Sequence, residues 1–182
     1  MRPQLVTETA AAVALATVLG LIKIPLPQLI NGGSVSLETL PVLIVACRHG
    51  ARVGLLTGVG LAVINLLLEP VVVHPAQVLL DYPLAYGGLG WVAGLIGQVP
   101  GPAAAAPEWL ARVRVVAAMV AGNSARLAAH FASGTIFFAA YAPPGQAAWI
   151  YSLVYNASYL GPQLLLHILL LQLVFRLLTQ HR

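Results

Sequence analysis

Long apolar runs separated by short polar stretches constrain this chain more than any other feature of its sequence. Hydrophobic residues make up 59% of its 182 residues, and charged residues only 8%. A water-soluble domain is about 45–50% apolar and about 25% charged. Because a membrane-crossing helix needs about 20 residues, the chain has room for about six or seven crossings at most. The sequence therefore predicts an integral membrane protein with almost no residues left for a soluble domain.

Six apolar segments can be placed along the chain, and together they predict one membrane domain covering residues 1–182. Proline, glycine and charged residues mark their borders. A Gly/Asn/Ser-rich loop is expected at 28–36 and the longest loop at 97–107, and the second segment is short for a full crossing. We expect an all-α bundle of six transmembrane helices, with spans at 5–24, 37–47, 53–68, 76–96, 113–140 and 148–178.

The basic residues are distributed unequally between the two ends of these segments. Lysine and arginine are enriched in cytoplasmic loops. With the N-terminus inside, seven of the nine basic residues fall at inner ends, Lys23 falls at an outer end, and Arg126 lies within the fifth segment. Both termini are therefore expected in the cytoplasm and the protein in the cell membrane.

The sequence lacks the residues that several functional classes require. No GxxxxGK[ST] loop is present, so partner subunits would have to bind any ATP. Cys47 is the single cysteine, which excludes an internal disulfide and a cysteine-based zinc cluster. No His/Asp/Glu set has metal-ligand spacing, and no basic cluster interleaved with aromatic residues indicates nucleic-acid binding. Ser152 and His130 could form a hydrolase dyad, but no nucleophile motif surrounds Ser152. We expect no enzyme activity, no metal and no cofactor.

Ionisable side chains inside the spans are costly and usually functional. At ~1.5 Å rise per residue, Asp81, Asn156 and His130 lie about 8, 12 and 15 Å from the outer ends of three different spans. Aromatic residues accompany them in the same outer region: Tyr82, Phe137, Phe138, Trp149, Tyr151 and Tyr155. A carboxylate and aromatic faces suit a small, flat, cationic ligand. These residues predict a ligand pocket that opens outward.

Other interpretations of these residues remain open. Asp81 could form a structural ion pair with Arg126. Tyr82, Trp149 and Tyr151 could form an interfacial aromatic belt. Glu8 lies near the inner end of its span and is expected to reach the headgroups, and we expect His167 to be structural.

Alanines on the first span have the spacing of close helix contacts. The pairs Ala10/Ala14 and Ala12/Ala16 each place two small side chains on one helix face. Such pairs let another helix approach closely within lipid. The neighbouring helix could belong to a partner protein or to the bundle itself.

Four stretches of the chain together resemble a known family. They are Gly32-Gly33-Ser34-Val35-Ser36, His74-Pro75 with Leu79-Leu80-Asp81-Tyr82, Arg126 to His130 with Ser133-Gly134, and Trp149-Ile150-Tyr151-Ser152-Leu153 with Tyr155-Asn156. In this order they resemble the thiamine-specific substrate-binding (S) components of energy-coupling factor (ECF) transporters, the ThiT/YuaJ family. The resemblance covers nearly the whole chain.

The resemblance implies a six-helix S component that binds thiamine from outside. It further implies association with an ECF transmembrane coupling protein and two ABC-type ATPase subunits. The family's contact with the coupling protein falls on Ala10 and Ala14. Its ligand-binding positions fall on Asp81, Tyr82, His130, Phe138 (Trp in some members), Tyr151 and Asn156. Two alternatives stay open: an S component for another vitamin or a thiamine precursor such as hydroxymethylpyrimidine, and a small carrier that works alone.

Overall fold

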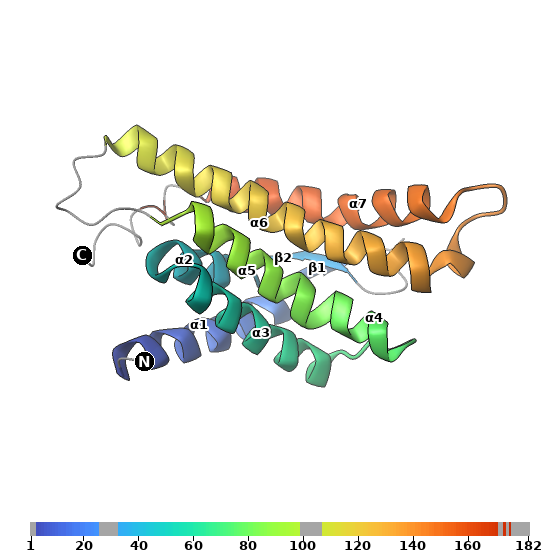
Figure 1. Cartoon of the computed structure of the whole chain (residues 1–182), viewed down its shortest axis with the longest axis horizontal. Helices are drawn as coiled ribbons and strands as arrows, with labels where there is room; N and C mark the ends of the chain where they lie inside the picture. The colour runs from blue at the N-terminus through green and yellow to red at the C-terminus, as the bar shows by residue number, and fades with distance from the viewer. Residues whose placement is uncertain (1–2, 26–32, 99–106, 171–172, 174, 176–182) are drawn as a thin grey trace.

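Apolar runs and helix-breaking residues divide the chain into antiparallel helices (Figure 1). The computed structural model describes residues 3–25, 33–98, 107–170, 173 and 175. Its α-helices are α1 (Pro3–Leu21), α2 (Leu40–His49), α3 (Ala51–Leu68), α4 (Pro75–Leu79), α5 (Ala85–Ile96), α6 (Glu108–Phe137) and α7 (Ala148–Leu169). A π-helical segment, η1 (Leu80–Leu84), joins α4 to α5, and a 3-10 turn, η2 (Ala139–Tyr141), follows α6.

Counting α4, η1 and α5 as one interrupted helix, the described residues form six helical units, as the sequence predicts. Helices α6 and α7 lie side by side, α5 packs between α6 and α3, and α1 packs against α2 and α3. The start of α1 and the end of α7 lie at the same end of the bundle (Figure 1). Helices α1 and α3 are each long and apolar enough to cross a membrane by themselves.

From α1 to α6, the helix boundaries differ from the predicted spans by up to five residues, and the largest difference is at the start of α6. Helix α6 begins at Glu108 rather than at 113 and ends at Phe137 rather than at 140. The earlier start follows from Pro107, which has an extended backbone at the N-cap, and from Glu108, whose negative charge suits the first turn of a helix. The last part of the sixth predicted span, from 171 to 178, lies largely outside the described residues.

A small β-hairpin, which the sequence did not predict, accompanies the helices of this otherwise all-α fold. Strand β1 (Lys23–Pro25) pairs antiparallel with β2 (Ser34–Ser36), with Ile24 opposite Val35. The predicted loop at 28–36 therefore ends in a strand. Chain that leaves a helix within an apolar environment still needs hydrogen-bond partners for its backbone, and the strand pairing supplies them. Strand β2 packs against α7, so the hairpin lies beside the interior of the bundle.

Helices α3 and α5 approach closely because glycines face each other across their contact. A Cβ atom added to Gly90 would lie 2.0 Å from the carbonyl oxygen of Gly54, and one added to Gly54 would lie 2.2 Å from the carbonyl oxygen of Gly90. Small residues at such contacts allow helix backbones to pack directly in a membrane. This contact fixes α5, and with it η1, against α3.

Proline 83 accounts for the interruption between α4 and α5. Proline has no N–H and cannot continue the ordinary helical hydrogen-bond ladder. The ladder widens here, and the N–H of Ala85 donates to the carbonyl of Leu80, five residues earlier. Single π-helical turns of this kind often occur at functional sites. The turn holds Tyr82, which is 8% exposed, and Asp81, whose side chain is 17% exposed.

Candidate ligand-binding site

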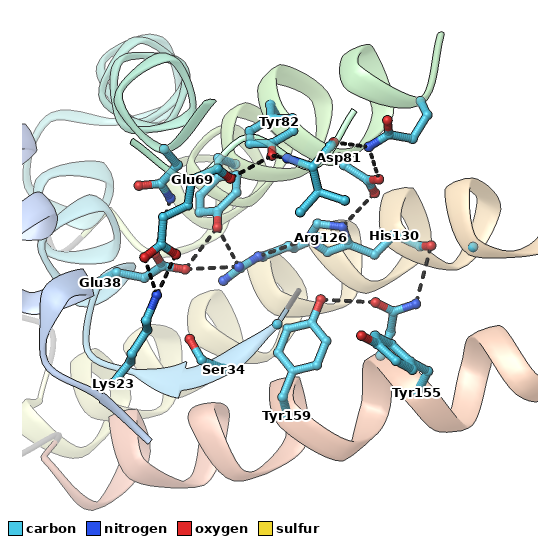
Figure 2. Close-up of a pocket in the computed structure, with 18 of the residues that line it drawn as sticks. Lys23, Ser34, Glu38, Glu69, Asp81, Tyr82, Arg126, His130, Tyr155 and Tyr159 are labelled. Atoms are coloured by element: carbon cyan, nitrogen blue, oxygen red, sulfur yellow. Dashed lines mark hydrogen bonds and ion pairs between the residues drawn. The ribbon is translucent and has the colours of Figure 1, made fainter. Parts of the chain in front are cut away.

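A cavity of about 220 Å³ lies between the helices and contains all six residues that the sequence predicted as ligand contacts. Its walls come from the end of α1, the β-hairpin, the end of α3, the α4–η1–α5 unit, the second half of α6 and the first half of α7 (Figure 2). The six predicted residues are Asp81, Tyr82, His130, Phe138, Tyr151 and Asn156. Tertiary packing thus brings side chains from η1, α6 and α7 into one pocket.

Two of the predicted aromatic neighbours lie outside this cavity. Trp149 is 53% exposed on the outside of the bundle, which favours the aromatic-belt interpretation for this residue. The ring of Phe137 stacks on His74, with the ring centroids 5.0 Å apart. Tyr151 and Tyr155 do line the cavity, and their ring centroids are 5.6 Å apart.

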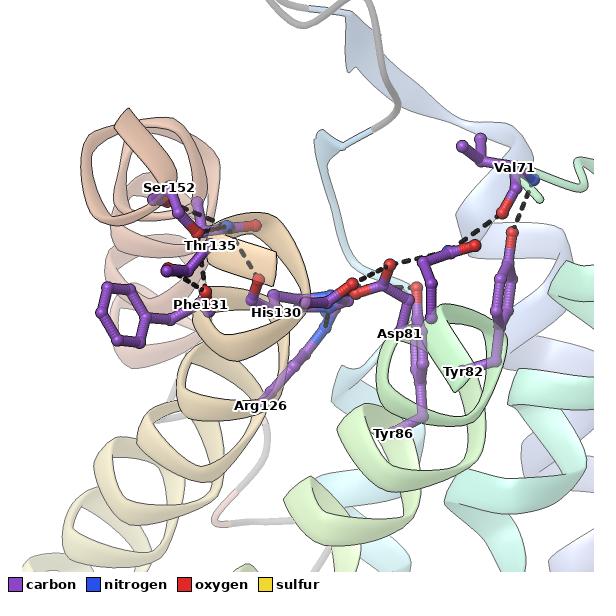
Figure 3. A network of polar contacts seen from close by, with 12 residues as sticks. Val71, Asp81, Tyr82, Tyr86, Arg126, His130, Phe131, Thr135 and Ser152 are labelled. Carbon is purple, nitrogen blue, oxygen red and sulfur yellow. Dashed lines mark hydrogen bonds and ion pairs between the residues drawn. The ribbon is translucent and has the colours of Figure 1, made fainter. Parts of the chain in front are cut away.

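Asp81 is held by three donors from two helical units, and Figure 3 shows its contact with His130. Its Oδ2 accepts hydrogen bonds from Gln77 Nε2 at 2.7 Å and from Ser133 Oγ at 2.7 Å. Its Oδ1 lies 2.9 Å from His130 Nδ1. The carboxylate is therefore oriented at the junction of η1 and α6, facing a cavity that aromatic side chains surround.

Arg126 pairs with Glu38, so the alternative ion pair between Asp81 and Arg126 is not formed. Arg126 Nη2 donates to Glu38 Oε1 at 3.0 Å and to the hydroxyl of Tyr86 at 2.9 Å. Its Nη1 lies 3.3 Å from Gln163 Oε1, and the guanidinium carbon lies 4.2 Å from the centroid of the Tyr86 ring. Every nitrogen of the guanidinium has a partner, because Nε donates to His130 Nε2 at 3.3 Å.

Sequence reasoning missed Glu38 as a pocket residue. Its side chain is 13% exposed, and its Oε2 accepts from Asn65 Nδ2 at 3.1 Å. Glu38 stands at the start of the short second segment, so the hydropathy pattern placed it at the membrane edge. The available signal was the carboxylate itself, since a buried arginine on another span needs an anionic partner.

A second ion pair, missed for the same reason, lies where α1 and α3 end. Lys23 on β1 contacts both carboxylate oxygens of Glu69, the residue that follows α3. Both residues line the cavity. Their side chains are 32% and 65% exposed, so this pair lies closer to solvent than the pair of Arg126 and Glu38.

Hydrogen bonds within the protein position the remaining predicted residues. The hydroxyl of Tyr82 accepts from the N–H of Val71 at 2.8 Å. The amide nitrogen of Asn156 donates to the carbonyls of Ser152 at 2.9 Å and His130 at 3.3 Å. The hydroxyl of Ser152 donates to the carbonyl of Phe131 at 2.9 Å rather than to His130, so the imagined hydrolase dyad is not formed.

The alanines of α1 fall on two different faces. Ala12 and Ala16 are buried, with 8% and 0% of their surface exposed, whereas Ala10 and Ala14 are exposed. Ala12 and Ala16 therefore pack inside the bundle, and Ala10 and Ala14 face outward.

Of two other ionisable span residues, one has partners that the sequence did not predict, and the other agrees with the prediction. Glu8 lies 2.7 Å from His49 Nε2 and 3.5 Å from an Arg48 nitrogen, so it pairs with α2 instead of only reaching the headgroups. His167 is 0% exposed, in agreement with a structural position.

The fold and the site define a class: a small, largely apolar helical bundle that encloses a polar, aromatic-lined cavity. A family model described as thiamine transporter protein (Thia_YuaJ) matches residues 6–181. A curated relative from Bacillus subtilis strain 168, thiamine transporter ThiT, is 38% identical over 172 residues, which is 92% of this chain and 85% of the relative. The chain therefore belongs to the Thia_YuaJ family of thiamine transporter proteins.

Two further comparisons agree with this membership. Thiamine transporter ThiT from Lacticaseibacillus paracasei is 27% identical over 159 residues, covering 85% of this chain and 79% of that protein. The solved structure of ThiT from Listeria monocytogenes matches with a TM-score of 0.83 and 26% identity, covering 98% of both chains. The similarity thus extends over the whole bundle.

Proposed function

We propose that this chain binds thiamine in the cavity between its helices and serves as the S component of an ECF-type importer in the cell membrane. The observation that carries the proposal is the carboxylate of Asp81, which faces an aromatic-lined cavity and is held by Gln77, His130 and Ser133. The relatives with the names quoted above support thiamine as the ligand.

Thiamine has the chemistry that this cavity can complement. Its thiazolium ring carries a permanent positive charge, which the carboxylate of Asp81 would attract. Both of its rings are flat, and the cavity offers the faces of Tyr151, Tyr155 and Phe138 for stacking. The aminopyrimidine has hydrogen-bond donors and acceptors, for which Asn156 is a suitable neighbour. None of these roles requires chemistry on the ligand.

Delivery would depend on partner subunits. The sequence has no nucleotide-binding loop of its own, so a transmembrane coupling protein and two ABC-type ATPases would supply the energy. The exposed pair Ala10 and Ala14 on α1 is a suitable surface for the coupling protein, because small side chains let a second helix approach closely. With both termini in the cytoplasm, the cavity would open toward the outside.

Calorimetric titration of the purified protein in detergent tests the ligand. Wild type should bind thiamine, and Asp81→Asn should weaken binding by about tenfold or more because a charge-assisted interaction is lost. Ser133→Ala is the matched control, since it removes one hydrogen bond from Asp81 but leaves the charge. Equal affinities of wild type and Asp81→Asn would reject the role of the carboxylate.

Two further arms separate the alternatives. If the pyrimidine fragment, hydroxymethylpyrimidine, binds wild type more tightly than thiamine does, the ligand assignment is wrong. If vesicles that contain only this chain accumulate thiamine, it is a carrier that works alone. We expect thiamine to bind more tightly and uptake to require the coupling module.

A further inference from the structure

The cavity lining contains nearly equal numbers of negative and positive side chains. The way they pair determines the net charge that acts on a ligand. The described lining contains three carboxylates, Glu38, Glu69 and Asp81, and two permanent cations, Lys23 and Arg126. Glu69 pairs with Lys23 and Glu38 pairs with Arg126. Asp81 contacts His130, whose charge depends on its protonation.

The hydrogen bonds around His130 define its protonation state. Arg126 Nε carries a hydrogen and cannot accept, so at 3.3 Å it donates to His130 Nε2. His130 Nε2 must then present its lone pair, and the single ring hydrogen sits on Nδ1. That nitrogen donates to Asp81 Oδ1 at 2.9 Å (Figure 3). A protonated His130 would point a second N–H at the guanidinium of Arg126, which can only donate. Arg126 therefore keeps His130 neutral.

All three donors to Asp81 are consequently neutral. They are the amide of Gln77, the hydroxyl of Ser133 and the imidazole of His130. Among the carboxylates in the described lining, Asp81 alone lacks a cationic partner. The cavity thus has one uncompensated negative charge.

This balance depends on Glu38. Arg126 has a side chain that is 4% exposed, so water screens its charge poorly. Without Glu38, its positive charge would act on the same cavity and offset the charge of Asp81. Glu38 compensates Arg126 through Oε1 at 3.0 Å (Figure 2). The hydroxyl of Tyr86 donates to Glu38 at 2.9 Å and accepts from Arg126 at 2.9 Å.

We infer that Glu38 is a specificity-determining residue: by compensating Arg126, it leaves Asp81 as the single net charge of the cavity and so makes the site selective for a monocationic ligand over a neutral ligand of the same shape. Glu38 acts through Arg126 and is a positioning residue. This inference rests on the proposed function, because it takes thiamine as the cationic ligand.

The test compares two ligands of equal shape on four proteins. The ligands are thiamine and its neutral thiophene analogue, in which carbon replaces the charged ring nitrogen. The proteins are wild type, Glu38→Gln, Arg126→Gln and the double variant. The quantity measured by calorimetry is the ratio of the two dissociation constants, because a general loss of packing lowers both affinities and leaves their ratio unchanged.

We expect wild type to prefer the cation and Glu38→Gln to lower that preference by about tenfold or more, since an uncompensated Arg126 then faces the ligand. The double variant should restore the preference, because neither member of the pair remains charged. Arg126→Gln should hold or raise the preference, since Glu38 adds negative charge and the new side-chain amide can still donate to His130 Nε2 and keep the imidazole neutral. This last variant keeps the test decisive if Glu38→Gln does not fold.

The remaining outcomes contradict either the role of Glu38 or the proposed function. A preference that is unchanged in Glu38→Gln, or one that falls in Arg126→Gln, refutes the role of Glu38. A double variant that keeps the reduced preference of Glu38→Gln also refutes it. Absence of thiamine binding to folded wild type instead rejects the proposed function, so the two failures are distinguishable.

Discussion

The contact between Gly54 and Gly90 gives a prediction whose size can be worked from the structure. In Gly90→Ala, the new Cβ would lie 2.0 Å from the carbonyl oxygen of Gly54, whereas ordinary contact begins at 3.4 Å. The nearest atoms belong to backbone, so no flexible side chain can give way. Helices α3 and α5 must open by the difference between these two distances.

Two opposing terms set the expected loss of stability. Overpacking of this kind costs about 3 kcal/mol, and the higher helix propensity of alanine returns about 1 kcal/mol. A net loss of about 2 kcal/mol corresponds to a decrease of about 4–8 °C in Tm for a chain of this length. Gly88→Ala is the matched control, because Gly88 lies on the same helix and a Cβ there meets nothing within 4 Å.

Thermal unfolding in detergent, followed by the fraction of monodisperse protein on size exclusion, measures both variants. Gly88→Ala should melt at or slightly above the wild-type temperature and Gly90→Ala clearly below it. The reasoning is refuted if Gly90→Ala melts as high as Gly88→Ala, since the helices would then accommodate the added methyl group without loss.

Two further predictions concern the ion pair near solvent and the alanines of α1. Lys23→Met should change the free energy of unfolding by less than about 1 kcal/mol, because its partner Glu69 is 65% exposed; a larger loss in urea or thermal unfolding would contradict this. Ala16→Leu should destabilise the protein, since Ala16 is 0% exposed. The double variant Ala10→Leu with Ala14→Leu should leave Tm and thiamine binding intact. It should abolish uptake in cells that contain the coupling module. Loss of thiamine binding in that double variant would indicate that the exposed pair has a packing role.

Hydropathy predicted the helical units well because it depends on composition along a single segment. The predicted border at Glu69 directly follows the end of α3 at Leu68, whereas α1 ends at Leu21, before the predicted border at Pro25, and α6 begins five residues before 113. The β-hairpin escaped prediction because strands of three residues leave no periodic pattern. The π-helical turn also escaped, although Pro83 marks its position, because a proline inside an apolar run is equally compatible with a kink.

The polar pocket was predictable in part, and the reason differs between residues. Asp81, His130 and Asn156 lie well inside apolar spans, where a polar side chain is conspicuous. Glu38, Lys23 and Glu69 lie at segment ends, where charged residues are ordinary, so their positions gave no signal.

The sequence by itself determined the class of molecule, since apolar runs of membrane length with few charges can satisfy their backbone groups only as packed helices. It also supplied the ionisable residues of the pocket. Only the tertiary structure decided their pairing. Arg126 and Glu38 are 88 positions apart, and Asp81 and His130 are 49 apart. Which charge compensates which depends on the helix faces that pack together, and direct contact of Gly54 with Gly90 is part of what sets those faces.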